Sequence, residues 1–121
     1  MNDEKKMLVA MAQAIYDKKG FNITALDVRD ISTMAQYVLI AEGNVEKHVQ
    51  ALTRTVVDVI KERGEQPLHV DGDRYGDWVV VDCGDIVVHL FAPGVRERYR
   101  LEMLWGKGGI VDLDITTGKE G

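Results

Sequence analysis

Residues 78–91 read WVVVDCGDIVVHLF, and this stretch decides the fold. Trp78–Val81 and Ile86–Phe91 are rich in β-branched residues, which favour strands, and a short connection separates the two runs. Gly84 in that connection can adopt a positive φ, and the aspartates beside it favour a turn. The stretch therefore predicts a β-hairpin.

Upstream of the hairpin, the sequence predicts a buried strand followed by an amphipathic helix. The run Tyr37–Ala41 is apolar throughout, which is typical of a central strand covered on both faces. Asn44 is predicted to open the helix, and its apolar residues then recur every three or four positions: Val45, Val49, Leu52, Val56, Val59 and Ile60. Gly64 is expected to end this helix, and Pro67 to prevent its restart.

Shorter elements are predicted towards both ends of the chain. An amphipathic pattern indicates a first helix that stops at Gly20, and Ile23–Val28 is predicted to be a strand. Downstream of the hairpin, Arg96–Trp105 is predicted to form a short helix and Ile110–Ile115 a final short strand. Helices interleaved with strands in this order indicate an α/β fold, a mixed β-sheet flanked by helices.

Length, composition and charge limit the class of protein. The chain has 121 residues, 45% of them hydrophobic and 29% charged, which fits a single globular domain. We expect this domain over residues 1–115 and a flexible tail over residues 116–121. The net charge of −5 disfavours broad, non-specific nucleic-acid binding, so DNA is not an expected partner.

The sequence also predicts a cytoplasmic location. The single cysteine, Cys83, cannot form an internal disulfide, and residues 1–15 lack the unbroken apolar centre of a signal peptide. No stretch approaches the length of apolar sequence that a transmembrane helix needs, so no membrane association is expected.

A phosphate-binding corner is suggested at Gly43-Asn44, which lies between a strand and a helix. No glycine-rich phosphate motif surrounds it, so the signal has little specificity. A nucleotidyltransferase with this corner needs two carboxylates shortly downstream to hold its metal ions. Asp112 and Asp114 have the right alternation but lie far along the chain, close to its C-terminus. A metal-dependent, nucleotidyltransferase-like nucleotide-binding protein is therefore kept only as the alternative function.

Histidine and cysteine give no sign of a metal centre or a nucleophile. His48, His69 and His89 have no ligand spacing with one another or with Cys83. His89 lies in an apolar strand, where an imidazole is more often a hydrogen-bonded structural group. Acidic neighbours raise the pKa of Cys83 and suppress its reactivity. We expect no catalytic residue, no metal and no cofactor.

The region around the hairpin is unusual in charge and in aromatic content. Residues 65–92 carry six acidic side chains and one basic side chain, whereas residues 93–107 carry four basic and two acidic ones. Five of the eight aromatic residues lie in or beside this region. The composition is typical of a specific protein-binding face. It fits equally an aromatic core beneath a solvated acidic surface, and both interpretations stay open.

Longer motifs connect the hairpin with the segments around it. They are the hairpin itself, Arg96-x-x-Tyr99-x-Leu101-Glu102-x-Leu104-Trp105, Leu26-Asp27-Val28, Tyr37–Ala41 with Gly43, and His48-Val49-Gln50-Ala51. Together they resemble the ribosomal silencing factor family, also called iojap-like proteins, over nearly the whole chain. The resemblance implies a nucleotidyltransferase-like fold without the catalytic carboxylates. The chain departs from the family at Val45, where other members carry serine, which weakens any anion-binding role further.

The resemblance also implies a function. Members bind the large-subunit ribosomal protein numbered fourteen on the intersubunit face and keep the small subunit from joining, which lowers translation when nutrients are scarce. The residues then expected to bind the partner are Asp77, Trp78, Asp82, His89, Phe91, Arg96 and Tyr99. Arg96 is expected either to face nearby ribosomal RNA or to pair with Glu102. The same aromatic face is a candidate for a homodimer of the free chain.

Overall fold

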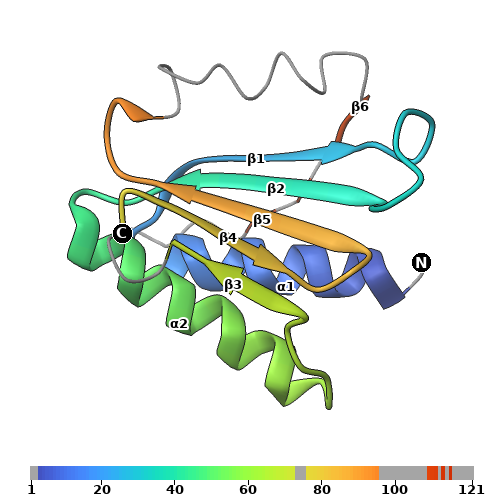
Figure 1. Ribbon diagram of the computed structural model, residues 1–121, viewed down its shortest axis with the longest axis horizontal. Coiled ribbons are helices and arrows are strands. Elements are labelled where there is room, and N and C mark those ends of the chain that lie inside the picture. Colours follow the sequence, from blue (N-terminus) through green and yellow to red (C-terminus); the bar gives the residue numbers. More distant parts are fainter. Residues whose placement is uncertain (1–2, 73–75, 96–108, 112, 114, 116–121) are drawn as a thin grey trace.

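A six-stranded mixed sheet forms the centre of the computed structural model, which describes residues 3–72, 76–95, 109–111, 113 and 115. The elements follow one another as α1 (Asp3–Asp17), β1 (Phe21–Asp27), β2 (Tyr37–Glu42), α2 (Glu46–Glu62), β3 (His69–Asp71), β4 (Trp78–Asp82), β5 (Ile86–Phe91) and β6 (Gly109–Ile110). The strand order is β3-β4-β5-β2-β1-β6 (Figure 1). Only the β2–β5 pair is parallel among these strands. The predicted α/β fold with a mixed sheet is confirmed.

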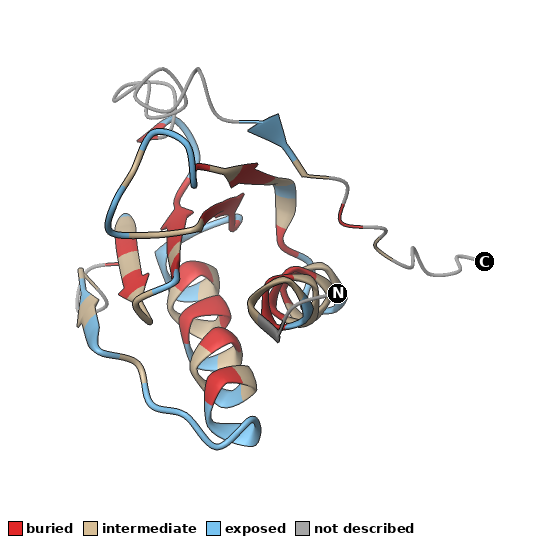
Figure 2. Cartoon of the chain, turned by 90° about the vertical axis from the view of Figure 1, so that its right-hand side faces the viewer, coloured by how far each residue is buried: buried red, intermediate tan, exposed pale blue. Residues whose placement is uncertain are grey.

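The two described helices pack side by side on one face of the sheet (Figure 2). α2 lies against β4 and β5, and α1 lies against β1 and β2. The buried side of α2 follows the helical period, with Val49, Leu52, Thr53, Val56 and Ile60. From α1, the fully buried side chains are Leu8, Met11, Ala12 and Ile15. Much of the core therefore lies between the helix pair and the sheet, and Val38, Ile40 and Phe91 on the other face of the sheet are buried as well.

The position of β2 in the middle of the sheet explains its apolar sequence. All six of its residues are buried, including Glu42 at its end. On one side it pairs with β1, and on the other with β5, so both of its hydrogen-bonding edges are occupied. The prediction of a central strand over Tyr37–Ala41 is confirmed.

The strands near the sheet edges differ most from the prediction. β1 begins at Phe21, two residues earlier than expected, because a bulge around Asn22, with a φ of 51°, interrupts the alternation that marks a strand. β3 was not predicted: it has three residues and lies at the exposed edge beside β4. The strand predicted over Ile110–Ile115 is wrong beyond Ile110: β6 covers Gly109–Ile110, pairs with Leu26 and Asp27 of β1, and is followed by described residues outside any strand. The predicted helix over Arg96–Trp105 lies outside the described residues.

The start of α2 also corrects the sequence prediction. The helix begins at Glu46, with Val45 at the N-cap and no side-chain cap hydrogen bond. The backbone N–H of Asn44 instead donates to Nδ1 of His48 at 2.9 Å, because the imidazole folds back over the first turn. Val45, expected on the buried side, is 54% exposed for the same reason: it precedes the helix.

Candidate functional site

The predicted binding residues gather on the sheet face opposite the helices. On β4, Val79 and Val81 are fully buried towards the helix layer, so their neighbours point the other way. We call this opposite side the distal face. Cross-strand pairing defines it by three rows: Trp78–Phe91–Glu42, Val80–His89–Ile40 and Asp82–Val87–Val38.

A tight turn fixes this register. The backbone N–H of Gly84 donates to Oδ1 of Asp82 at 2.8 Å, and Cys83 N–H donates to the Ile86 carbonyl at 3.0 Å. Gly84 has a φ of 88°, a conformation that glycine adopts without steric cost. The predicted hairpin is confirmed, and its turn is what places Trp78 opposite Phe91.

Three rings form a cluster on the distal face. The Trp78 ring centroid lies 5.6 Å from that of Phe91 and 6.2 Å from that of His89, and the imidazole stacks on Phe91 at 6.2 Å. The indole Nε1–H donates to Nδ1 of His89 at 3.2 Å. Trp78 is half-buried, whereas Phe91 is fully buried. The cluster therefore holds the indole of the half-buried Trp78 in a fixed orientation.

His89 is a neutral hydrogen-bond acceptor within this cluster. It is only 7% exposed, and burial lowers the pKa of its imidazole to about 4. Because Nδ1 accepts from Trp78, the single proton of the neutral ring lies on Nε2. The expectation of a hydrogen-bonded structural histidine in this strand is confirmed, and its structural task is to orient the indole.

Two aspartates mark the ends of β4. Asp77 is exposed, and its Oδ1 accepts from the Trp78 backbone N–H at 2.9 Å. Asp82 is half-buried and holds the hairpin turn. Neither carboxylate has a cationic partner among the ion pairs of the described residues. The half-buried Trp78 therefore lies on a strand with a carboxylate at each end.

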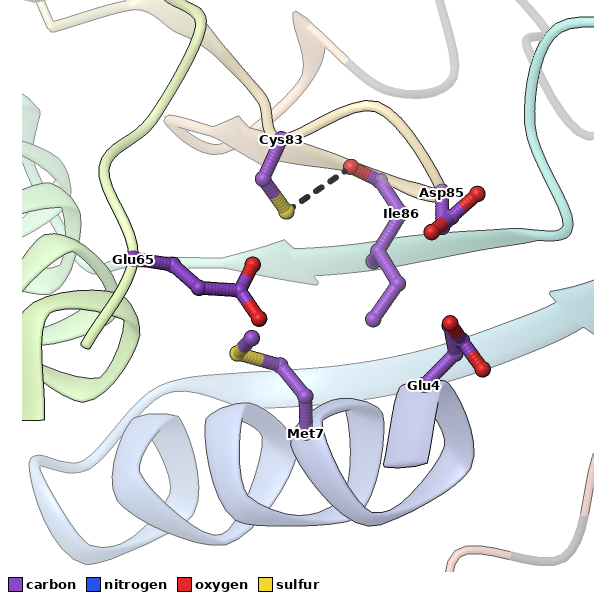
Figure 3. Close-up of a pocket in the computed structure, with 6 residues that line it drawn as sticks. All are labelled: Glu4, Met7, Glu65, Cys83, Asp85 and Ile86. Atoms are coloured by element: carbon purple, nitrogen blue, oxygen red, sulfur yellow. Dashed lines mark hydrogen bonds between the residues drawn. The ribbon is translucent and has the colours of Figure 1, made fainter. Parts of the chain in front are cut away.

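Cys83 lines a small cavity between the hairpin turn, α1 and the segment after α2 (Figure 3). The space measures about 50 Å³, and its lining residues are Glu4, Met7, Glu65, Cys83, Asp85 and Ile86. The thiol donates to the Ile86 carbonyl at 3.1 Å. Burial, assisted by the charges of Asp82, Glu65 and Asp85, raises the pKa of the thiol to about 11. The thiol is thus protonated at neutral pH and is no nucleophile.

The Gly43-Asn44 corner has a packing role. A Cβ on Gly43 would lie 3.0 Å from the Val49 side chain and 3.2 Å from Nδ1 of His48, so glycine lets α2 approach β2 closely. The imidazole takes the Asn44 N–H, and its Nε2–H donates to the Lys18 carbonyl at 2.8 Å. The Asn44 N–H is therefore already taken by His48 and is not available to an anion.

Neither a metal site nor a membrane-spanning helix is found among the described residues. Within them, no group of three or more histidine, cysteine or carboxylate side chains is placed to hold a metal ion. No helix among them has the length and apolar character that crossing a membrane requires. Asp112 and Asp114, the carboxylates of the alternative function, lie outside the described residues.

Five of the seven predicted binding residues can be placed. Trp78, His89 and Phe91 come together in one cluster, whereas Asp77 and Asp82 lie at opposite ends of β4. Phe91 has no exposed surface, so it supports the indole from behind instead of meeting a partner itself. Arg96 and Tyr99 lie outside the described residues.

Sequence reasoning missed two apolar side chains near this face. Met34 is 85% exposed and Leu68 is 72% exposed. No local pattern distinguishes an exposed methionine or leucine from a buried one, because neither residue lies in a periodic segment. Only the tertiary structure shows that these two side chains are exposed.

Comparisons with known proteins now identify the family. Residues 1–120 match the family described as "Ribosomal silencing factor during starvation". The chain belongs to the ribosomal silencing factor family. It is 43% identical over 112 residues to the ribosomal silencing factor RsfS of Bacillus subtilis, a match that spans 93% of this chain and 95% of that protein.

Structural comparison agrees with this membership. A crystal structure of a Chromobacterium violaceum protein superposes with a TM-score of 0.83 at 33% identity and covers 98% of each chain. A more distant mouse relative, "Mitochondrial assembly of ribosomal large subunit protein 1", is 31% identical over 82% of this chain and 43% of its own length. The resemblance to silencing factors drawn from the sequence is thereby confirmed.

Proposed function

We propose that this silencing factor represses translation by binding the large ribosomal subunit through the ribosomal protein numbered fourteen. Once bound, it blocks the small subunit from joining. Family membership supports a ribosome-associated silencing role. The name of the mouse relative associates that protein with the large subunit, which supports the choice of subunit. The role is regulatory, needs no catalytic residue, and places the chain in the cytoplasm with the ribosomes.

The observation that carries the proposal is the fixed, half-buried indole of Trp78 on a strand with aspartates at its ends. Tryptophan is enriched among the residues that dominate binding energy at protein interfaces. Its orientation is already set by His89 and Phe91, so little conformational entropy is lost when a partner binds. Asp77 and Asp82 suit a basic partner, and ribosomal proteins carry many lysines and arginines to meet RNA phosphates.

Steric exclusion requires only that the chain stay on the intersubunit face. Trp78, Val80 and Asp82, the partly exposed residues of β4 on the distal face, bind the ribosomal protein. The helices lie on the opposite side of the sheet (Figure 2), so in this arrangement they project away from that protein towards the incoming subunit. Arg96 and Tyr99 remain predicted members of the binding surface, with Arg96 assigned either to nearby ribosomal RNA or to Glu102. A homodimer of the free chain through this face is compatible with the role, because ribosome binding would dissociate it.

Co-sedimentation with purified large subunits tests the proposal. We expect the chain to be retained on large subunits and to reduce the fraction of intact ribosomes formed when small subunits are added. A well-folded chain that stays in the supernatant would contradict the proposal. Calorimetry with ATP and magnesium checks the alternative, since saturable heat is expected only of a nucleotide-binding protein.

The variant Trp78→Ala tests the binding surface itself. Loss of an interface anchor of this kind costs about 2 kcal/mol or more, equivalent to about thirtyfold weaker binding. Tyr16→Ala serves as the matched control, because Tyr16 is a half-buried aromatic residue of α1 in the helix layer. Thermal melting shows whether each variant is folded. Equal retention of a folded Trp78→Ala variant would exclude the indole as an anchor.

A further inference from the structure

A second surface feature lies beside the aromatic cluster. The loop between β1 and β2, the segment before β3 and the β4–β5 turn enclose an apolar groove of about 370 Å³. We call it the Met34–Leu68 groove, and its lining residues are Val28, Ser32, Met34, Ala35, Val38, Leu68, Asp82, Gly84 and Val87. Val38, Val87 and Asp82 form one row of the distal face, so the groove continues that face towards the turn.

Backbone hydrogen bonds fix the walls of the groove. The Leu68 N–H donates to the Asp82 carbonyl, and the Gln36 N–H donates to the Asp85 carbonyl, both at 2.8 Å. Within the β1–β2 loop, Oγ of Ser32 accepts from the N–H groups of Met34 and Ala35 at 3.1 and 3.3 Å. These hydrogen bonds hold the segments that line the groove in their places beside the sheet.

Two large apolar side chains stand open to solvent at this groove. Met34 and Leu68 are among the most exposed large hydrophobic residues in the described part of the chain. Moving an apolar side chain out of water is favourable, so an exposed apolar pair beside an apolar groove is suited to contact a partner. Methionine adds adaptability, because its unbranched thioether fills irregular gaps in a partner.

The charge around the groove favours a basic partner over a second copy of this chain. Asp82 lines it and has no cationic partner among the ion pairs of the described residues. The nearest cation of the β1–β2 loop, Arg29, is already paired with Asp27 through Nε at 2.9 Å. The whole chain carries a net charge of −5. A second copy would bring more negative charge to an acidic rim, whereas a basic partner would be attracted.

We propose that the Met34–Leu68 groove receives an apolar side chain carried on a lysine- or arginine-bearing segment of the ribosomal partner. The proposal rests on the proposed function. The aromatic cluster and the groove then form two neighbouring anchor points on the distal face, two rows apart on the same strands. Two anchors fix the rotation of the bound chain as well as its position, and steric exclusion of the small subunit depends on both.

The test compares variants that keep the fold. Met34→Gln with Leu68→Asn removes the two apolar side chains from exposed positions, where substitution costs little stability. Ile110→Asn is the matched control, since Ile110 is 82% exposed on β6 at the opposite edge of the sheet. Asp82→Asn removes the charge but keeps an oxygen to accept from Gly84 N–H. Binding to purified large subunits is measured by sedimentation over a concentration series, and folding by thermal melting.

We expect the double variant to bind at least about tenfold more weakly than wild type and the control to bind equally well. Asp82→Asn is expected to weaken binding at low salt, with the difference shrinking as salt is raised. Unchanged binding of the folded double variant overturns the groove assignment while leaving the proposed function intact. Failure of the wild type to bind overturns both. A concentration-dependent wild-type dimer that the double variant abolishes, with ribosome binding unchanged, assigns the groove to a second copy and also overturns the proposal.

Discussion

His89 puts a polar ring into a row of the sheet that is otherwise apolar, between Val80 and Ile40. A buried imidazole is tolerated there because it is neutral and because it accepts the indole N–H of Trp78. A phenylalanine at this position would fill similar space but would remove the Nδ1 acceptor of this hydrogen bond. The single residue therefore couples the orientation of the surface indole to the protonation state of a buried ring.

This coupling predicts a pH dependence of stability. The unfolded chain takes up the proton near the ordinary pKa of 6.5, whereas the folded chain resists it down to about 4. The unfolded state therefore binds more protons between these values, and the free energy of unfolding falls as pH drops from 6.5 to 4. The contribution of His89 to this loss is about 3 kcal/mol.

Urea denaturation of the wild type and of His89→Asn across this pH range measures the effect. Asparagine does not titrate, and its amide oxygen can still accept from the indole. We expect the variant to show a flatter stability profile between pH 6.5 and 4, because all other titrating groups are shared. Parallel profiles would show that His89 does not titrate differently in the folded and unfolded states.

At the scale of elements, sequence patterns found the segments that are buried on a regular period. β5 was predicted with its observed bounds, and β2 and β4 to within one residue, because their apolar runs are continuous. β3 was not predicted, because its three residues are too few to show the alternation of buried and exposed side chains that marks a strand. The groove could not be predicted either, because its lining residues come from separate segments of the chain that only the sheet order brings together.

The junction of α1, β2 and α2 yields a prediction about His48. Its ring accepts from the Asn44 N–H and donates to the Lys18 carbonyl, so it joins the end of one helix to the start of the other. His48→Ala leaves both backbone groups without this partner, and we expect the free energy of unfolding to fall by about 1–2 kcal/mol. Lys47→Ala, at the exposed neighbouring position, is the control and should change stability by less than about 0.5 kcal/mol. Equal losses in the two variants, measured by urea denaturation, would contradict the assigned role.

At the scale of the whole molecule, residues near the end of the chain belong to the same core as the early helices and strands. Leu113 is 7% exposed and belongs to the same core as the helices and the sheet, and Ile115 packs against it. β6 pairs with β1, the first strand, so early and late segments share one edge of the sheet. The domain boundary after residue 115 stays a prediction.

Two variants test that boundary. Leu113→Ala is expected to lower the free energy of unfolding by about 2–4 kcal/mol, because it removes buried methyl groups and leaves a cavity. A chain shortened to end at Ile115 keeps both core contacts and should melt within about 2 °C of the full chain. A large loss on removing residues 116–121 would place the boundary further along.

The parallel β2–β5 pair has a consequence for synthesis of the chain. α2, β3 and β4 are all translated between these two strands, so β2 leaves the ribosome with β1 as its sheet partner and waits for β5. Contacts between segments so far apart in sequence form slowly, and a waiting strand edge can pair with foreign chains. The distal face exists only after the β4–β5 hairpin has docked against β2. The binding surface proposed above is therefore not assembled in a nascent copy until β5 has been released.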